Sequence, residues 1–95
     1  MKLAQIQMQV TDNKTLNLWH AAELIQQTEA DMVILPEMFC CPYDNGCFRA
    51  YGEEEGGAAW DILSRTARDK GIWLVGGSLP ELEGDRVYNL SLIHI

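Results

Sequence analysis

Basic residues are scarce in this sequence. Seven lysines and arginines stand against 14 aspartates and glutamates, which leaves a formal net charge of −7 at pH 7. Nucleic acids and anionic membranes are bound through a basic face, so this balance argues against both kinds of partner. Long apolar runs are absent too, since none approaches the roughly 18 residues that a membrane-spanning helix needs. The opening stretch MKLAQIQMQV is interrupted by three glutamines, and we expect no secretory signal there.

Cysteines are few, and their spacing does not suit the usual cysteine sites. Cys40, Cys41 and Cys47 are odd in number and lack the C-x-x-C spacing of a zinc site or a redox pair. The glycines of residues 76–78, GGS, lack the longer frame and the lysine of a phosphate-binding loop. We therefore expect no metal and no cofactor, and free thiols in a reducing cytoplasm.

The hydrophobic residues that are present change their period along the chain. Residues 3–10 alternate as a strand does, and Ala4, Ile6, Met8 and Val10 share one face. The pattern then predicts a helix over 14–28, buried strands over 32–35 and 72–75, a helix over 58–70, and a hairpin around 83–85. Strands that alternate with helices indicate a single α/β domain, or a piece of one. Residues 40–57 should form a long loop with at most a short helix, its acidic run 53–55 facing solvent.

A glutamate at the end of a predicted strand is the first candidate for chemistry. In the stretch VILPEMFCCPYD an apolar run meets Pro36, and Glu37 follows. Reactive groups of open α/β sheets collect at the carboxyl ends of strands, where a shielded carboxylate can act as a general base. The alternative is a glutamate that caps a loop or pairs with an arginine, and position alone favours it. Cys40 and Cys41 have no neighbouring histidine, so small apolar side chains describe them better than nucleophiles.

The same stretch, VILPEMFCCPYD, resembles the first catalytic motif of the nitrilase superfamily of carbon–nitrogen hydrolases. Three further stretches resemble the family's first three strands and hairpin, in the family's order. They are LAQIQ, ADMVILPEMF, and IWLVGGSLPE followed by VYN. LPE-x-F-x-x-PY, YGE and GGSLPE are together most similar to the omega-amidase branch, which hydrolyses monoamides of 2-oxo dicarboxylates or deaminated glutathione. The resemblance implies the leading part of a truncated α-β-β-α sandwich.

The resemblance also implies a mechanism. The family uses a Glu-Lys-Cys triad, in which the glutamate takes the thiol proton and the lysine stabilises the oxyanion. Glu37 matches the glutamate, while Phe39 and Tyr43 fall where the family's substrate pocket begins; loop packing is the alternative for both. The family's lysine and cysteine have no counterpart in this chain. None of its lysines and cysteines occupies a matching position; these are Lys2, Lys14, Lys70, Cys40, Cys41 and Cys47. We therefore expect a small-molecule amide as substrate, a homo-oligomeric full-length form, and no activity of this chain alone.

The last six residues depart from the family's pattern. After Asn89 the family continues with threonine or a similar residue, whereas this chain reads LSLIHI. One set of codons for LSLIHI spells CTGTCTCTTATACACATC, the transposon-end adapter of sequencing libraries. We therefore expect residues 1–89 to be the N-terminal part of a carbon–nitrogen hydrolase domain and residues 90–95 to be a non-native tail. A genuine apolar strand is the alternative.

Two classes of function remain open from the sequence. One is the leading part of a thiol-dependent amidase, and the other is a non-catalytic α/β binding or regulatory module in which Glu37 is structural. A domain cut short in this way should also leave its sheet incomplete. We expect strands 32–35 and 72–75 to lack partners on at least one side, and an isolated chain to aggregate through them.

Overall fold

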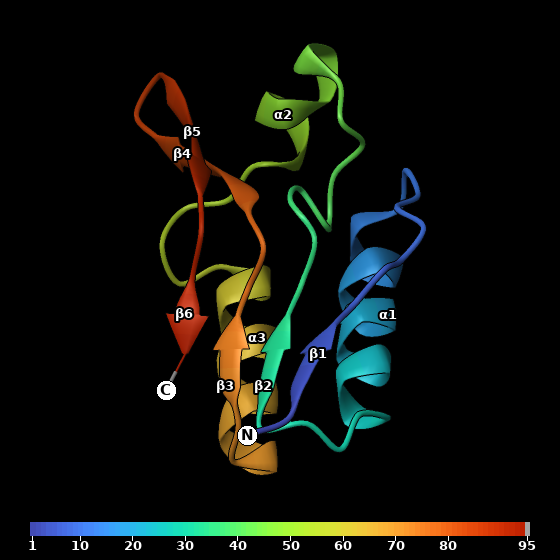
Figure 1. Cartoon of the computed structure of the whole chain (residues 1–95). Helices are drawn as coiled ribbons and strands as arrows, with labels where there is room; N and C mark the ends of the chain where they lie inside the picture. The colour runs from blue at the N-terminus through green and yellow to red at the C-terminus, as the bar shows by residue number, and fades with distance from the viewer. Residues whose placement is uncertain (95) are drawn as a thin grey trace.

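Strands and helices alternate in the structure as the hydrophobic pattern predicts, which confirms the α/β class. The computed structural model describes residues 1–94 (Figure 1). In order, the elements are β1 (Leu3–Gln5), α1 (Lys14–Gln26), β2 (Met32–Ile34), α2 (Asn45–Tyr51), α3 (Ala58–Lys70), β3 (Trp73–Val75), β4 (Leu79–Glu83), β5 (Arg86–Leu90) and β6 (Ile93–His94). None of the helices in residues 1–94 combines the length and the apolar character that crossing a membrane requires.

The main sheet has the strand order β1-β2-β3-β6. Strands β1 and β3 flank β2 in parallel, with Ala4 and Leu74 beside Val33, and β6 pairs antiparallel with β3. Helices α1 and α3 contact each other and lie together on one face of this sheet (Figure 1). Their apolar residues, such as Ile25 and Leu63, pack with Val33 and Leu74 into one core. Hairpin β4–β5 forms a separate two-stranded sheet beyond the ends of the parallel strands (Figure 1).

Local signals define both long helices. The Asn13 side chain accepts a hydrogen bond from the backbone N–H of Leu16 at 3.0 Å and so caps α1. Buried Asn17 reaches back to Thr11, accepting from its backbone N–H at 2.9 Å and donating to its carbonyl at 2.8 Å, so its polar groups are satisfied. Helix α3 ends at Gly71, whose φ of 66° lies in the left-handed region that glycine adopts without cost.

The first strand is shorter than predicted. Alternation over residues 3–10 persists, since Ile6 is buried and Gln5 and Gln7 are exposed, yet the ladder stops at Gln5. The Ile6 N–H still donates to the Ile34 carbonyl at 2.9 Å. Strand β2 ends just before Pro36, so residues 7–10 extend past the end of β2 and have no partner strand there. Alternation therefore predicts which side chains face the core but not how far the pairing extends.

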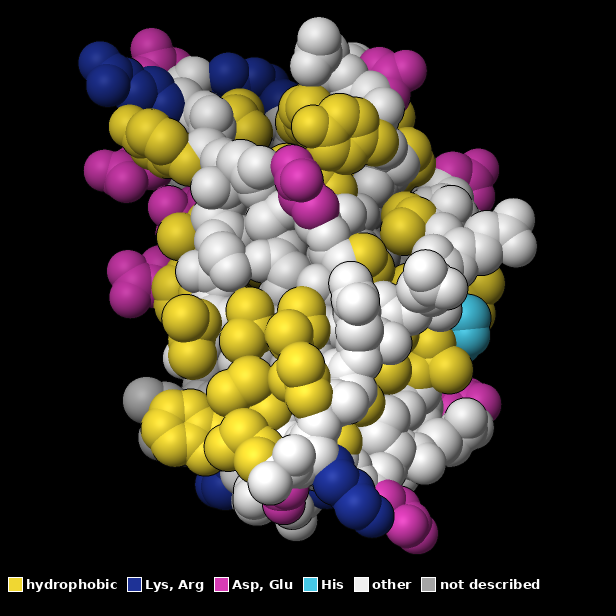
Figure 2. Space-filling view, viewed as in Figure 1, with side chains coloured by type: hydrophobic (Ala, Val, Ile, Leu, Met, Phe, Trp, Pro, Cys, Tyr) yellow, Lys and Arg dark blue, Asp and Glu magenta, His cyan; other side chains and the backbone are white. Residues whose placement is uncertain are grey.

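The two helices cover only one face of the main sheet. On the opposite face Leu3 and Trp73 flank Met32 in one row, while Ile93 lies beside Val75 in the next. Leu3, Trp73 and Ile93 are 61%, 43% and 66% exposed. Figure 2 shows apolar side chains gathered in front of these strands. Contiguous exposed apolar side chains mark interaction sites or aggregation liabilities.

The expectation that the two central strands lack a partner on at least one side is wrong. Strand β2 lies between β1 and β3, and β3 lies between β2 and β6. Strand β6 belongs to the segment 90–95, which the sequence predicts to be a non-native tail. Leu92, which precedes β6 in this segment, is buried, and its carbonyl accepts a hydrogen bond from the Gly76 N–H at 2.6 Å. The last residue of that segment, Ile95, lies outside the described residues. Pairing does not test where the segment comes from, so its non-native origin stays a prediction.

Candidate active site

Glu37 lies just beyond the carboxyl end of β2, where the sequence predicts a reactive group. Its Oε1 accepts hydrogen bonds from the Asn89 Nδ2 at 3.2 Å and, more weakly, from the Tyr43 hydroxyl at 3.5 Å. The side chain borders a hollow whose wall is formed by Gly77, Ser78 and Asn89. In the structure Glu37 is exposed, so its carboxylate is not shielded from water as the sequence led us to expect.

The backbone after Glu37 is held in an unusual conformation. Met38 has a φ of 50°, in the left-handed region that costs a non-glycine residue roughly 1–2 kcal/mol. Ser78 stabilises this turn, since its Oγ accepts from the Met38 N–H at 3.0 Å and its carbonyl accepts from the Phe39 N–H at 3.3 Å. Strained backbone of this kind persists where surrounding contacts impose it, and it clusters at functional sites.

Gly77 lies where the chain after β3 passes the end of β2. Its φ is 57°, and a Cβ at this position would lie 2.0 Å from the Pro36 carbonyl oxygen. Only glycine lets the chain after β3 approach the end of β2 so closely. The stretch is therefore a site of tight packing at a strand end. The close approach positions Ser78 and the hairpin beside Glu37.

The two predicted substrate-binding residues occupy different environments. Tyr43 is 74% exposed, donates to Glu37, and makes an edge contact with Phe48 at 5.6 Å between ring centroids. Phe39 is fully buried and belongs to the hydrophobic core. Substrate contact by either residue stays a prediction, and the contacts of Phe39 are those of loop packing.

Sequence reasoning missed Asn89. Its amide bonds Glu37 across 52 residues of sequence, from β5 to the end of β2. The available signal was the VYN motif, which was interpreted only as part of a hairpin. An amide donor at this point holds the carboxylate in one orientation.

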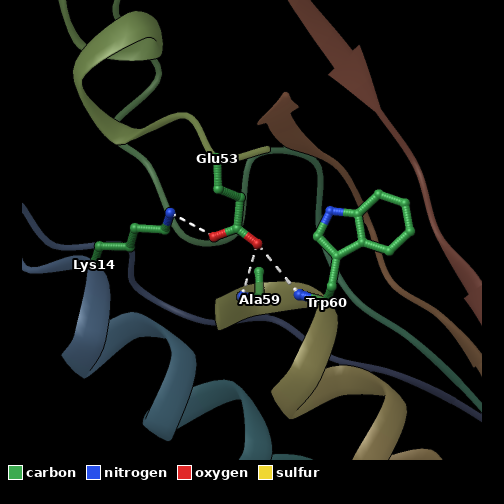
Figure 3. Close-up of polar contacts among 4 residues, drawn as sticks. All are labelled: Lys14, Glu53, Ala59 and Trp60. Atoms are coloured by element: carbon green, nitrogen blue, oxygen red, sulfur yellow. Dashed lines mark hydrogen bonds and ion pairs between the residues drawn. The ribbon is translucent and has the colours of Figure 1, made fainter. Parts of the chain in front are cut away.

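The acidic run of residues 53–55 was predicted to face solvent, and this is wrong for Glu53. Glu54 and Glu55 are exposed, but only 8% of Glu53 is. The Oε2 of Glu53 lies 2.6 Å from the Lys14 Nζ, and its Oε1 accepts from the N–H groups of Ala59 at 2.8 Å and Trp60 at 3.3 Å (Figure 3). One carboxylate therefore joins the start of α1 to the start of α3.

The backbone of Glu53 makes a third connection. Its N–H donates to the Pro80 carbonyl at 3.1 Å, and its carbonyl accepts from the Leu82 N–H at 2.9 Å. Both partners belong to β4, the strand that pairs with the strand carrying Asn89. Glu53 thus connects the long loop with the starts of α1 and α3 and with the hairpin that carries Asn89.

A family model described as "Carbon-nitrogen hydrolase" matches residues 2–94 of this chain. The chain belongs to the carbon–nitrogen hydrolase family. It is 42% identical over 91 residues to "Omega-amidase NIT2" of Danio rerio, covering 93% of this chain and 33% of that protein. It is 40% identical to "Omega-amidase, chloroplastic" of Arabidopsis thaliana, covering 92% of this chain and 26% of that protein. The omega-amidase-like resemblance is thereby confirmed.

Solved structures agree with this assignment. Nit3 of Saccharomyces cerevisiae, a member of branch 10 of the nitrilase superfamily, superposes with a TM-score of 0.86 at 34% identity, covering 99% of this chain and 39% of that chain. The carbon–nitrogen hydrolase fold over residues 1–94 is therefore the nitrilase type, as predicted. The chain spans about a third of the length of the curated omega-amidases it matches.

The three cysteines of this carbon–nitrogen hydrolase chain are all unpaired. Burial raises the pKa of the Cys40 thiol to about 12, with Lys14 opposing the rise and Glu53 adding to it. Burial likewise raises the pKa of Cys41 to about 11, with the nearby Cys47 adding to the rise. A thiol with such a pKa carries almost no thiolate at neutral pH, and only the thiolate attacks a carbonyl. Cys40 and Cys41 therefore act as small apolar side chains.

Alkylation with iodoacetamide at pH 8 should discriminate between these thiols. With a pKa of about 12, only about 10⁻⁴ of Cys40 is thiolate at that pH, and burial blocks access as well. We expect Cys40 and Cys41 of the folded full-length protein to react at least about 10²-fold more slowly than the half-buried Cys47. Fragmentation of the labelled peptide measures each site, and unfolding in denaturant should equalise the three. Native labelling at equal rates would contradict the burial of this pair.

Proposed function

We propose that this chain is the leading part of an omega-amidase-like enzyme that hydrolyses the amide of a small 2-oxo acid. The observation that carries the proposal is the position of Glu37 at the carboxyl end of β2, with Asn89 and Tyr43 donating to its Oε1 beside a hollow. A carboxylate so oriented has one oxygen held by donors and the other open to a reacting group. The similarity to proteins named omega-amidase supports this choice of substrate class.

In the proposed reaction Glu37 is the general base. It accepts the proton of a cysteine thiol, and the thiolate attacks the amide carbon. The tetrahedral oxyanion is stabilised by a lysine, and the leaving nitrogen takes the proton from Glu37 and departs as ammonia. Glu37 then deprotonates the water that hydrolyses the thioester to the acid. The lysine and the cysteine come from parts of the enzyme beyond residues 1–94, so this chain is inactive alone.

The alternative is a non-catalytic α/β binding or regulatory module. In that case the hydrogen bonds from Tyr43 and Asn89 to Glu37 would only fasten the loop after β2 to the hairpin. The amidase is the better proposal, because a purely structural tie would not require the left-handed backbone at Met38 immediately after the carboxylate.

We propose in addition that the full-length enzyme is cytoplasmic and forms a homo-oligomer. Its ligand is a small-molecule amide substrate. The three unpaired cysteines suit a reducing compartment. Self-association would bury apolar surface that a monomer leaves in water.

Ammonia release from 2-oxoglutaramate tests the proposed function. A full-length form of the protein should release ammonia and form a thioester during turnover, while the 95-residue chain expressed alone should release none. A thermal melt of the isolated chain should be broad, because the apolar face of the main sheet with Leu3, Trp73 and Ile93 is exposed.

Two results would contradict this proposal. The first is that the isolated chain releases ammonia and that Glu37→Gln abolishes this release. A lysine and a cysteine from elsewhere would then be dispensable. A full-length form that binds 2-oxoglutaramate without hydrolysing it would favour the binding module.

A further inference from the structure

The peptide groups on either side of Glu37 are both contacted by the segment that follows β3. The Pro36 carbonyl belongs to the peptide group before Glu37, and a Cβ on Gly77 would lie 2.0 Å from its oxygen, so the Gly77 backbone packs directly against it. The Met38 N–H belongs to the peptide group after Glu37 and donates to the Ser78 Oγ at 3.0 Å. Peptide groups are planar and rigid, so these contacts constrain the direction in which the Glu37 side chain leaves the backbone.

The hydrogen bond between Met38 and Ser78 is buried. Met38 is 5% exposed and Ser78 is 6% exposed, so water does not compete for the Met38 N–H. Loss of the Ser78 hydroxyl would leave this buried donor without a partner. A second bond, from the Phe39 N–H to the Ser78 carbonyl at 3.3 Å, uses only the backbone and does not depend on the side chain at position 78. The contribution of the hydroxyl can therefore be separated by mutation.

The hydroxyl of Ser78 opposes a backbone preference of Met38. The φ of 50° at Met38 is unfavourable for any residue with a Cβ, and its cost corresponds to a factor of about 10 in the population of that conformation. The bond to Ser78 opposes this cost directly, because it holds the N–H of the strained residue itself. Without that bond we expect Met38 to relax to a conformation with negative φ, which turns the peptide group attached to Glu37.

We infer that Ser78 is a positioning residue for the reaction. Its hydroxyl holds Met38 in the left-handed conformation and thereby sets the direction of the Glu37 side chain. Asn89 and Tyr43 bond the carboxylate at the far end of the same side chain, so Glu37 is held both at its backbone and at its Oε1. The inference rests on the proposed function for the role of Glu37 as general base, and it gives Ser78 a role that needs no contact with the substrate.

A double-mutant cycle between Ser78→Ala and Met38→Gly tests this role in a full-length form of the protein. Glycine adopts the left-handed conformation without cost, so a protein with Met38→Gly does not need the hydroxyl to impose it. We expect Ser78→Ala alone to lower kcat for 2-oxoglutaramate by about 10-fold, the factor set by that conformational cost, with KM within a factor of about three of wild type. In the Met38→Gly background the same change should lower kcat by less than about threefold.

Thr66→Ala is the matched control, because it removes another buried hydroxyl, one that bonds the Ile62 carbonyl within α3 at 2.6 Å. Its kcat should equal that of wild type. An equal loss of kcat from Ser78→Ala in both backgrounds would overturn the inference, since the hydroxyl would then not act through Met38. A rise in KM with kcat unchanged would overturn it too, because that result indicates substrate contact. Ser78→Cys keeps the shape of the side chain with a weaker acceptor and takes the same place in the cycle if Ser78→Ala does not fold.

The side-chain amide signals of Asn89 in a proton–nitrogen correlation spectrum give a readout that does not depend on turnover. They are assigned by their absence in Asn89→Ala. Because the Asn89 Nδ2 bonds the Glu37 Oε1, these signals should shift in Ser78→Ala and should coincide between Met38→Gly and the double variant. Signals that Ser78→Ala leaves unmoved would overturn the inference whatever happens to kcat.

These two measurements separate the two proposals. If no amide is hydrolysed but the Asn89 signals behave as expected, the proposed function fails and the positioning of Glu37 by Ser78 holds. If 2-oxoglutaramate is hydrolysed while Ser78→Ala changes neither kcat nor these signals, the inference fails and the proposed function holds.

Discussion

In a full-length form of the protein, Glu37→Gln is expected to lower kcat for hydrolysis of 2-oxoglutaramate by about 10²–10⁴-fold, the usual effect of losing a positioned general base. Glutamine keeps the shape of the side chain and an oxygen that can accept from Asn89 and Tyr43. It has no basicity, so the thiol proton has no acceptor and the thioester does not form. Rapid-quench measurement of thioester together with steady-state ammonia release measures both effects.

The fold of this variant should be nearly intact, because Glu37 is exposed and its neighbours keep their hydrogen bonds. Glu54→Gln is the matched control, since Glu54 is an exposed glutamate of the long loop that does not line the hollow beside Glu37. Its turnover should equal that of wild type. Turnover of Glu37→Gln within a factor of about three of wild type would mean that Glu37 is not the base.

Glu53→Ala is expected to have the largest effect on stability, lowering the free energy of unfolding by about 3 kcal/mol. The change leaves the ammonium of Lys14, which is 24% exposed, without its partner at 2.6 Å. It also removes the acceptor for the N–H groups of Ala59 and Trp60 at the start of α3 (Figure 3), a loss that costs about 1 kcal/mol by itself. Chemical unfolding of the full-length protein gives the measurement.

The neighbouring residue supplies the control. Glu54→Ala changes the same charge at an exposed site and should shift the unfolding free energy by no more than about 0.5 kcal/mol. Glu53→Gln should fall between the two, because its amide oxygen can still cap α3 while the ion pair with Lys14 is lost. Equal stability of Glu53→Ala and Glu54→Ala would show that the carboxylate does not join the two helices.

Much of the site follows from short-range sequence. The apolar run before Pro36 places Glu37 at a strand end, whatever the rest of the chain does, because proline cannot continue the ladder. Tyr43 lies within reach of that carboxylate because the loop between them is short. Asn89 could not be predicted in this way. Its contact with Glu37 depends on the hairpin folding back over the end of β2, which is a property of the whole chain.

The sequence by itself determined the α/β class, the caps at Asn13 and Gly71, and the strand-end position of Glu37, since each depends on the backbone preferences of a few adjacent residues. Only the tertiary structure decided which glutamate of the run 53–55 is buried. Three identical side chains have the same local preference, and the one that finds Lys14 and the start of α3 is chosen by distant segments. The pairing of β6 with β3 was decided in the same way, because hydrogen bonds between strands are made by backbone groups that every sequence has.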